Sequence, residues 1–244
     1  FSKMTGKINS TTYSANVDVD LNKKRIAATG TLPQYELTDV FSIFERIYKM
    51  PVEITGTGKA QLKVEGPFQI GKLSYDIDTT IFRGMAVGES FDRAEAHLIS
   101  ESGEMKIQKA KITKNKSEIN VTGLSHPDGK INLNVVGKRF PLEESENISK
   151  LGAQISGLVD VDMTLQGHIL AAETKMKGRI YQLNVEDQDF PASTFEMEFD
   201  PRKITGNTNL FAGQLKSEFI LPLQDTAPFK LDVNAKDWNY TTLF

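Results

Sequence analysis

Hydrophobic and polar residues alternate with a period of two along much of the chain. In residues 62–65, 73–81, 159–166 and 195–199 nearly every second residue is apolar, and the residues between are mostly charged or hydroxylated. Such alternation is typical of strands with one apolar face and one solvated face, as in antiparallel sheets. Dipeptides that contain Gly or Pro separate these stretches at short intervals, which predicts roughly eight strands per 100 residues and roughly 20 in all.

The apolar period changes to that of a helix in two places, residues 39–50 and 146–155. Asp39 is the expected N-cap of the first helix, and Pro51 is expected to end it. The apolar stripes are Val40, Phe41, Phe44, Ile47 and Tyr48 in the first segment and Ile148, Leu151 and Ile155 in the second. Both segments stand just before a strand that begins near a glycine.

Three pairs of segments match in the same order at nearly constant spacing, which indicates an internal repeat. The pairs are 56–66 with 157–167, 116–121 with 216–221, and 131–135 with 229–233, at offsets of 101, 100 and 98 residues. We therefore expect residues 1–50 to hold the end of a preceding repeat and a junction helix. Residues 51–155 would form a β-groove repeat with its own junction helix, and residues 156–244 a further repeat that is truncated at the next junction.

A large sheet with one apolar face has to hide that face, and two short helices cannot cover it. The sheet can pack on another sheet, close into a barrel, or curl along its length. The repeat and the recurring helices favour curling. The predicted fold is all-β: an elongated, twisted antiparallel sheet curled into an open hydrophobic groove, built of roughly 100-residue repeats with short amphipathic helices at the junctions. The same alternation also fits a tightly packed, dry core.

Composition removes several functional classes. The 244 residues include 29 Lys and Arg against 32 Asp and Glu, a net charge of −3, so no basic surface for nucleic acid is expected. The chain has no cysteine, and His97, His126 and His168 lie far apart without the spacing of metal ligands. No Gly-x-Ser-x-Gly motif is present, and His97 is expected to face solvent. The sequence thus predicts no enzyme activity, no cofactor and no metal site.

Four segments carry a resemblance to a known family. They are 56–67 (GTGKAQLKVEGP), 91–96 (FDRAEA), 120–123 (NVTG) and 132–135 (NLNV). With the amphipathic helix before the first of them, this order resembles the AsmA-like and TamB family of bacterial envelope proteins. The resemblance covers nearly the whole chain and is one of architecture more than of invariant residues.

The resemblance implies a location and a function. Members of that family are anchored in the inner membrane by an N-terminal helix, extend through the periplasm of Gram-negative bacteria and form long β-grooves with a hydrophobic inside. For this chain it implies a periplasmic segment that conducts phospholipid between the inner and outer membranes, as a bridge-like lipid transfer protein does. The alternative is a structural or protein-binding β-repeat scaffold that assists outer-membrane protein assembly. The implied partners are phospholipid acyl chains, the inner membrane through an anchor that precedes this chain, and an outer-membrane β-barrel protein, with no nucleic acid.

The period-two phase selects the residues that would line the groove, because a slip of one residue would bury their charged neighbours. The predicted lining is Leu62, Val64, Tyr75, Ile77, Val161, Met163, Leu165, Phe195, Met197, Phe199, Phe219, Leu231 and Val233.

Overall fold

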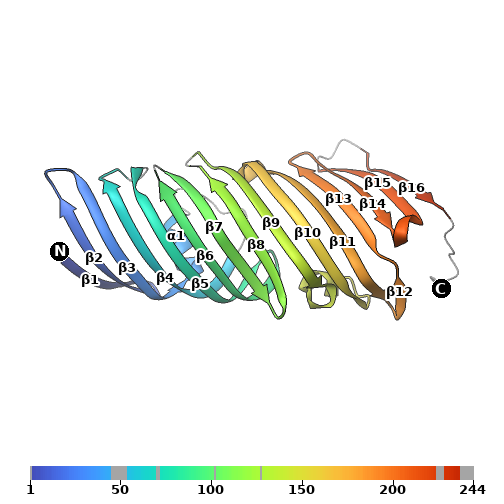
Figure 1. Cartoon of the computed structure of the whole chain (residues 1–244), viewed down its shortest axis with the longest axis horizontal. Helices are drawn as coiled ribbons and strands as arrows, with labels where there is room; N and C mark the ends of the chain where they lie inside the picture. Colours follow the sequence, from blue (N-terminus) through green and yellow to red (C-terminus); the bar gives the residue numbers. More distant parts are fainter. Residues whose placement is uncertain are drawn as a thin grey trace. The chain divides into compact units, whose positions relative to one another are not determined.

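The structure is a computed structural model that describes residues 2–44, 54–69, 72–101, 103–126, 128–223 and 228–236. It is all-β, with 75% of residues in strands. Sixteen strands form one antiparallel sheet that does not close, and they follow one another in chain order except that β12 lies off the path, paired with β11 (Figure 1). Within the described residues the strands are fewer than the roughly 20 predicted, because several of them run for 13 or 14 residues.

The chain divides into two compact units. Unit 1 comprises Phe1–Asn115 and Asn120–Ile131. Its elements are β1 (Ser2–Ile8), β2 (Thr11–Asp20), β3 (Arg25–Glu36), α1 (Leu37–Phe44), β4 (Ile54–Pro67), β5 (Ser74–Ala86), β6 (Glu89–Glu101), β7 (Glu104–Lys114) and most of β8 (Ser117–Ser125). Each strand from β1 to β7 pairs with the next one along the chain.

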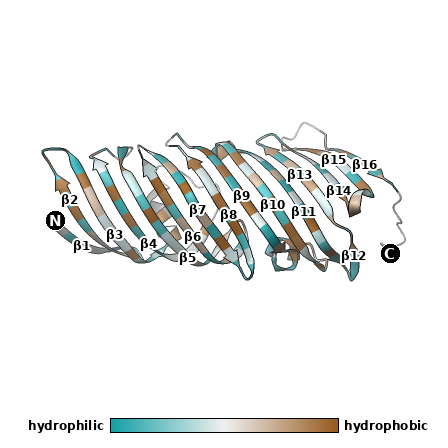
Figure 2. Cartoon of the chain, viewed as in Figure 1, coloured by the Kyte–Doolittle hydropathy of each residue, from teal (hydrophilic) through white to brown (hydrophobic). Residues whose placement is uncertain are grey.

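Unit 2 comprises Lys116–Ile119 and Asn132–Phe244. It contains most of β9 (Lys130–Pro141), then the 3-10 turn η2 (Leu142–Glu144), α2 (Glu146–Ser149), β10 (Ile155–His168), η3 (Ile169–Ala171), β11 (Glu173–Val185), β12 (Gln188–Phe190), β13 (Ser193–Asp200), β14 (Lys203–Leu210), η4 (Phe211–Gly213), β15 (Leu215–Pro222) and β16 (Lys230–Ala235). In both units hydrophobic and hydrophilic residues alternate along the strands (Figure 2), as the sequence predicts.

Both predicted helices are present, with different bounds. α1 begins at Leu37, two residues before the predicted start, and residues 45–53, which include Pro51, lie outside the described residues. α2 has only four residues, so the predicted helix over 146–155 is wrong beyond Lys150. Gly152 follows with a φ of 75°, a left-handed conformation that suits glycine and ends a helix.

Asp39 does not have the predicted role of N-cap, because it is the third residue of α1. Its carboxylate instead accepts hydrogen bonds from Ser10 N at 3.0 Å, from Thr11 Oγ1 at 3.1 Å and from the Asn9 amide at 3.3 Å. The Ser10 hydroxyl also donates a hydrogen bond to this carboxylate. The four hydrogen bonds, that of the Ser10 hydroxyl first among them, hold the pKa of Asp39 below its usual range. The carboxylate therefore ties α1 to the turn between β1 and β2.

Few apolar side chains are fully buried. Among the described residues they are Tyr35, Leu37, Ala60, Phe91 and Ile131. The first three form a cluster that includes Leu37, the first residue of α1, and Val40 of the predicted stripe packs against it. The side chains of the other stripe residues, Phe41, Phe44, Ile47 and Tyr48, lie outside the described residues. Most of the apolar face therefore lacks a second layer.

Five glycines in the strands pair directly with an aromatic residue on a neighbouring strand. The pairs are Gly6 with Tyr13, Gly58 with Tyr35, Gly84 with Phe91, Gly178 with Phe195, and Gly206 with Phe219. In every pair the ring occupies the place where a Cβ on the glycine would stand. The rings therefore lie down over the sheet, an arrangement that hides backbone left bare by glycine.

Candidate functional site

The four predicted lining residues in unit 1 share one face of the sheet. Leu62 on β4 pairs with Ile77 on β5, and Val64 pairs with Tyr75. Directly paired residues on antiparallel strands point to the same side. All four side chains are half-buried. α1 lies against the same face, because the cluster that Leu37 of α1 forms includes Ala60 on β4, two residues before Leu62.

The nine predicted lining residues in unit 2 also share one face, as three rows that cross the strands. The rows are Val161, Gly178, Phe195, Thr208, Ser217 and Val233; Met163, Met176, Met197, Gly206, Phe219 and Leu231; and Leu165, Thr174, Phe199, Ile204 and Leu221. Seven of the nine are half-buried, whereas Leu231 and Val233 on β16 are 52% and 56% exposed. The apolar face therefore continues onto β16, the last strand of the sheet path.

The register adds residues that the sequence reasoning missed. Leu98 pairs with Ile77 and Ile107 pairs with Leu98, so both extend the face in unit 1. Met176 stands between Met163 and Met197 in unit 2. The alternation of apolar and polar residues along β11 could have identified Met176 as a lining residue. Gly178 interrupts that apolar pattern two residues later.

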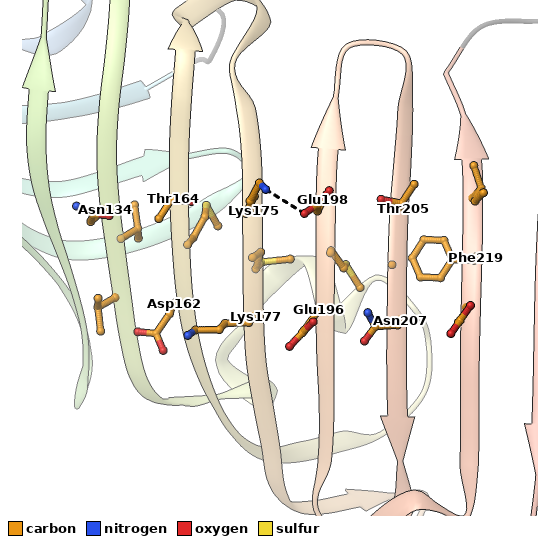
Figure 3. A pocket seen from close by; sticks show the side chains of 18 of the residues that line it. Asn134, Asp162, Thr164, Lys175, Lys177, Glu196, Glu198, Thr205, Asn207 and Phe219 are labelled. Carbon is orange, nitrogen blue, oxygen red and sulfur yellow. Dashed lines mark ion pairs between the residues drawn. The ribbon is translucent and has the colours of Figure 1, made fainter.

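A hollow in unit 2 has a volume of about 1070 Å³ (Figure 3). It takes in Met163, Met197 and Phe219 and none of the other predicted lining residues. Most of its lining comes from two rows on the opposite face, Asp162, Lys177, Glu196, Asn207, Glu218 and Asp232, and Thr164, Lys175, Glu198, Thr205, Ile220 and Lys230. This hollow is therefore lined mainly by the charged face.

The charged rows fix the register of unit 2. Lys175 lies 3.2 Å from Glu198 on the next strand, an ion pair drawn in Figure 3, and Lys138 lies 3.6 Å from Asp162. All four side chains are about half exposed or more, so each pair contributes little free energy. A slip of one residue would nevertheless turn these charges onto the apolar face, which the alternation forbids.

The three histidines lie in separate places. His97 is on the polar face of unit 1, where its side chain is 32% exposed and its Nδ1 lies 2.8 Å from Asp78. His126 Nδ1 lies 3.3 Å from Glu104, and His168 Nδ1 accepts a hydrogen bond from Leu170 N in the turn η3. Only His97 is close to two carboxylates.

Comparison with protein-family models, curated proteins and solved structures finds no match. Within the described part of the chain, no helix is both long enough and apolar enough to cross a membrane.

Proposed function

We propose that this chain is a periplasmic segment of an inner-membrane-anchored, bridge-like protein of the AsmA-like and TamB kind. It conducts phospholipid between the inner and outer membranes along a hydrophobic β-groove. The observation that carries the proposal is the one-sided sheet: apolar side chains gather on one face, and in the described residues little besides α1 covers it.

An acyl chain suits such a face, because it needs only a non-directional apolar lining. Each buried CH₂ contributes about 0.8 kcal/mol, and the phospholipid head group can stay in water. The row Met163, Met176 and Met197 supplies flexible thioether side chains that adapt to a mobile chain. Lipid transport of this kind requires no catalytic group and no cofactor.

A shared backbone feature supports the proposed repeat. Gly56 in β4 and Gly157 in β10 both have a φ of 146°, and the pairing shifts register at each of them. On the partner strands, Arg83 and Gln182 have φ values of 48° and 54°. The two glycines are 101 residues apart, the offset of the sequence repeat, and each follows a short helix. This supports repeats of roughly 100 residues with helices at the junctions.

Photocrosslinking tests the lipid path on both faces of the same strands. A photoreactive residue replaces Met163 or Met197 on the apolar face and, as matched controls, Asp162 or Glu196 one residue away on the charged face. In cells that express the full-length protein, the apolar positions should crosslink to phospholipid and the charged positions should not. Equal labelling of both faces, or none at Met163 and Met197, would refute the proposal.

Met163→Asp provides the functional counterpart. A carboxylate on the apolar face should reduce lipid transfer, because an acyl chain would have to pass a charge. The side chain is only half-buried, so the variant should still fold. Asp162→Asn, on the other face, should leave transfer unchanged. Normal transfer by a folded Met163→Asp variant would contradict a lipid path over this face.

A scaffold for outer-membrane protein assembly is the second candidate, favoured by the exposure of β16. Within the described residues β16 pairs with β15 alone, and all six of its residues are exposed. Such an edge can accept a partner strand. Crosslinks from Asn234 on β16 to an outer-membrane protein, without lipid crosslinks at Met163, would favour this function.

A further inference from the structure

Three metal-ligating side chains meet on the polar face of unit 1. Asp76 and Asp78 project from β5, and His97 projects from β6 directly opposite Asp78. His97 Nδ1 lies 2.8 Å from Asp78 Oδ1 and 3.7 Å from Asp76 Oδ1. One ligand atom from each residue lies within 4.8 Å of the other two. The group is at a mid-strand position on rigid elements, not on a loop.

Two carboxylates outnumber the one imidazole within this group, and Lys63 and Lys109 lie opposite Asp76 and His97 on the flanking strands. The imidazole is neutral or singly charged. Among the described residues, no lysine or arginine makes an ion pair with Asp76 or Asp78. Lys63, the cross-strand partner of Asp76, pairs instead with Glu65 at 3.4 Å. A divalent cation between the three side chains would remove the repulsion between the carboxylates.

We propose that Asp76, Asp78 and His97 bind one zinc ion. Zinc takes one imidazole nitrogen and two carboxylate oxygens at about 2.0–2.2 Å, with water as the fourth ligand of an open tetrahedral site. Bonds of that length separate neighbouring ligand atoms by about 3.3 Å. His97 Nδ1 lies 2.8 Å from Asp78 Oδ1 and 3.7 Å from Asp76 Oδ1, on either side of this value. Small side-chain rotations would therefore bring the three ligand atoms to the spacing that zinc requires. The metal replaces the proton shared between His97 and Asp78.

The surroundings of the cluster favour this site. The pairing of β6 with β7 shifts register beside His97: His97 pairs with Lys109 and Leu98 with Ile107, which leaves Gln108 as the extra residue of a bulge. Bulges of this kind re-aim side chains and occur often beside functional sites. A hollow of about 490 Å³ includes Asp78 and His97, but not Asp76, in its lining, together with Lys59, Lys109 and Lys111.

Zinc binding is independent of the proposed lipid path, because the cluster lies on the polar face of unit 1. Nothing in the sequence spacing signals it. His97 is 19 residues from Asp78, and only the register of β5 with β6 brings them together.

The test is titration of the tag-free, metal-stripped chain with zinc chloride, by calorimetry, and with cobalt chloride, by visible absorption. The wild-type chain should bind one zinc ion, and the cobalt form should show the strong visible bands of a tetrahedral site. His97→Gln should weaken binding by at least the 10- to 100-fold that loss of a ligand's supporting hydrogen bond costs. Asp76→Asn and Asp78→Asn should each weaken it by on the order of tenfold or more.

His126→Gln is the matched control, because His126 faces a single carboxylate, that of Glu104. Its zinc affinity should equal that of the wild-type chain. All variants change side chains that are about one third exposed or more and should keep the wild-type circular dichroism spectrum, so a loss of affinity does not reflect unfolding. Absence of zinc binding by the wild-type chain, unchanged affinity in His97→Gln, or an equal loss in His126→Gln would each overturn the proposal.

Discussion

Gly178→Ala probes the packing of aromatic rings onto glycines in unit 2. A Cβ at this position would stand 2.7 Å from the Asp160 carbonyl oxygen on β10 and closer still to the Phe195 ring on β13. Ordinary contacts of a Cβ are 3.4 to 4 Å. Moving the ring relieves only one of the two clashes, because the other involves the backbone of the neighbouring strand. We therefore expect the overpacking cost of about 1–3 kcal/mol to fall near its upper end.

Two other glycines of unit 2 provide graded controls. A Cβ on Gly206 would lie 2.6 Å from the Phe219 ring but 3.2 Å from the nearest backbone oxygen, so rotation of the ring relieves most of the strain. A Cβ on Gly137 would meet only side-chain carbons, the Val161 Cγ1 methyl at 3.1 Å and the Ile119 Cγ1 methylene at 3.6 Å. The loss of stability should therefore decrease in the order Gly178→Ala, Gly206→Ala, Gly137→Ala.

Urea unfolding, combined with hydrogen exchange of the amides in β9 to β15, measures these losses locally. Double variants show whether the clash with the ring or the clash with the backbone causes each loss of stability. Phe219→Leu should recover most of the loss in Gly206→Ala, whereas Phe195→Leu should recover only part of the loss in Gly178→Ala, since the backbone clash remains. The reasoning fails if Gly178→Ala is no less stable than Gly137→Ala, or if Phe195→Leu restores it completely.

Three further predictions concern single side chains. Asp39→Asn should destabilise the chain near neutral pH. Because the folded-state pKa of Asp39 is lowered, the contribution of its carboxylate to stability is present above the unfolded-state pKa and disappears as pH falls through the folded-state pKa. The melting curves of variant and wild type should therefore converge in acid. Ser145→Ala removes the cap whose hydroxyl accepts a hydrogen bond from Ile148 N at 3.1 Å, and should cost about 1 kcal/mol in urea unfolding, with faster hydrogen exchange confined to α2. Tyr35→Phe removes the 2.6 Å hydrogen bond to Thr79 and should cost about 0.5–1.5 kcal/mol; a change in thermal stability within error would contradict a structural role for that hydroxyl.

The alternation along the strands was sufficient to predict an all-β chain and the residues that share a face within each unit. Val161, Met163 and Leu165 alternate strictly with polar residues. Once one face of a strand is apolar, few pairing registers keep that face on the apolar side of the sheet. The helix bounds were less predictable. Asp39 resembles an N-cap in sequence, but its hydrogen bonds come from a turn some 30 residues away, which no local pattern reveals.

Contacts between strands also limited the prediction of sites. Phe219 was predicted only as a residue that lines the apolar face, and no pattern in the sequence indicated that its ring lies over Gly206 of the preceding strand. The cluster of Asp76, Asp78 and His97 depends on the register of two strands and on the bulge beside them. Such pairings follow from the whole sheet, whereas periodicity describes each strand alone.

The aromatic rings that lie on glycines also constrain how this sequence can diverge. Each such pair is complementary in shape: a larger residue in place of the glycine expels the ring, and a smaller residue in place of the ring exposes the glycine backbone. Neither partner can change alone without loss, although both can change together. Homologous sequences should therefore keep or lose Gly178 with Phe195, and Gly206 with Phe219, as linked pairs.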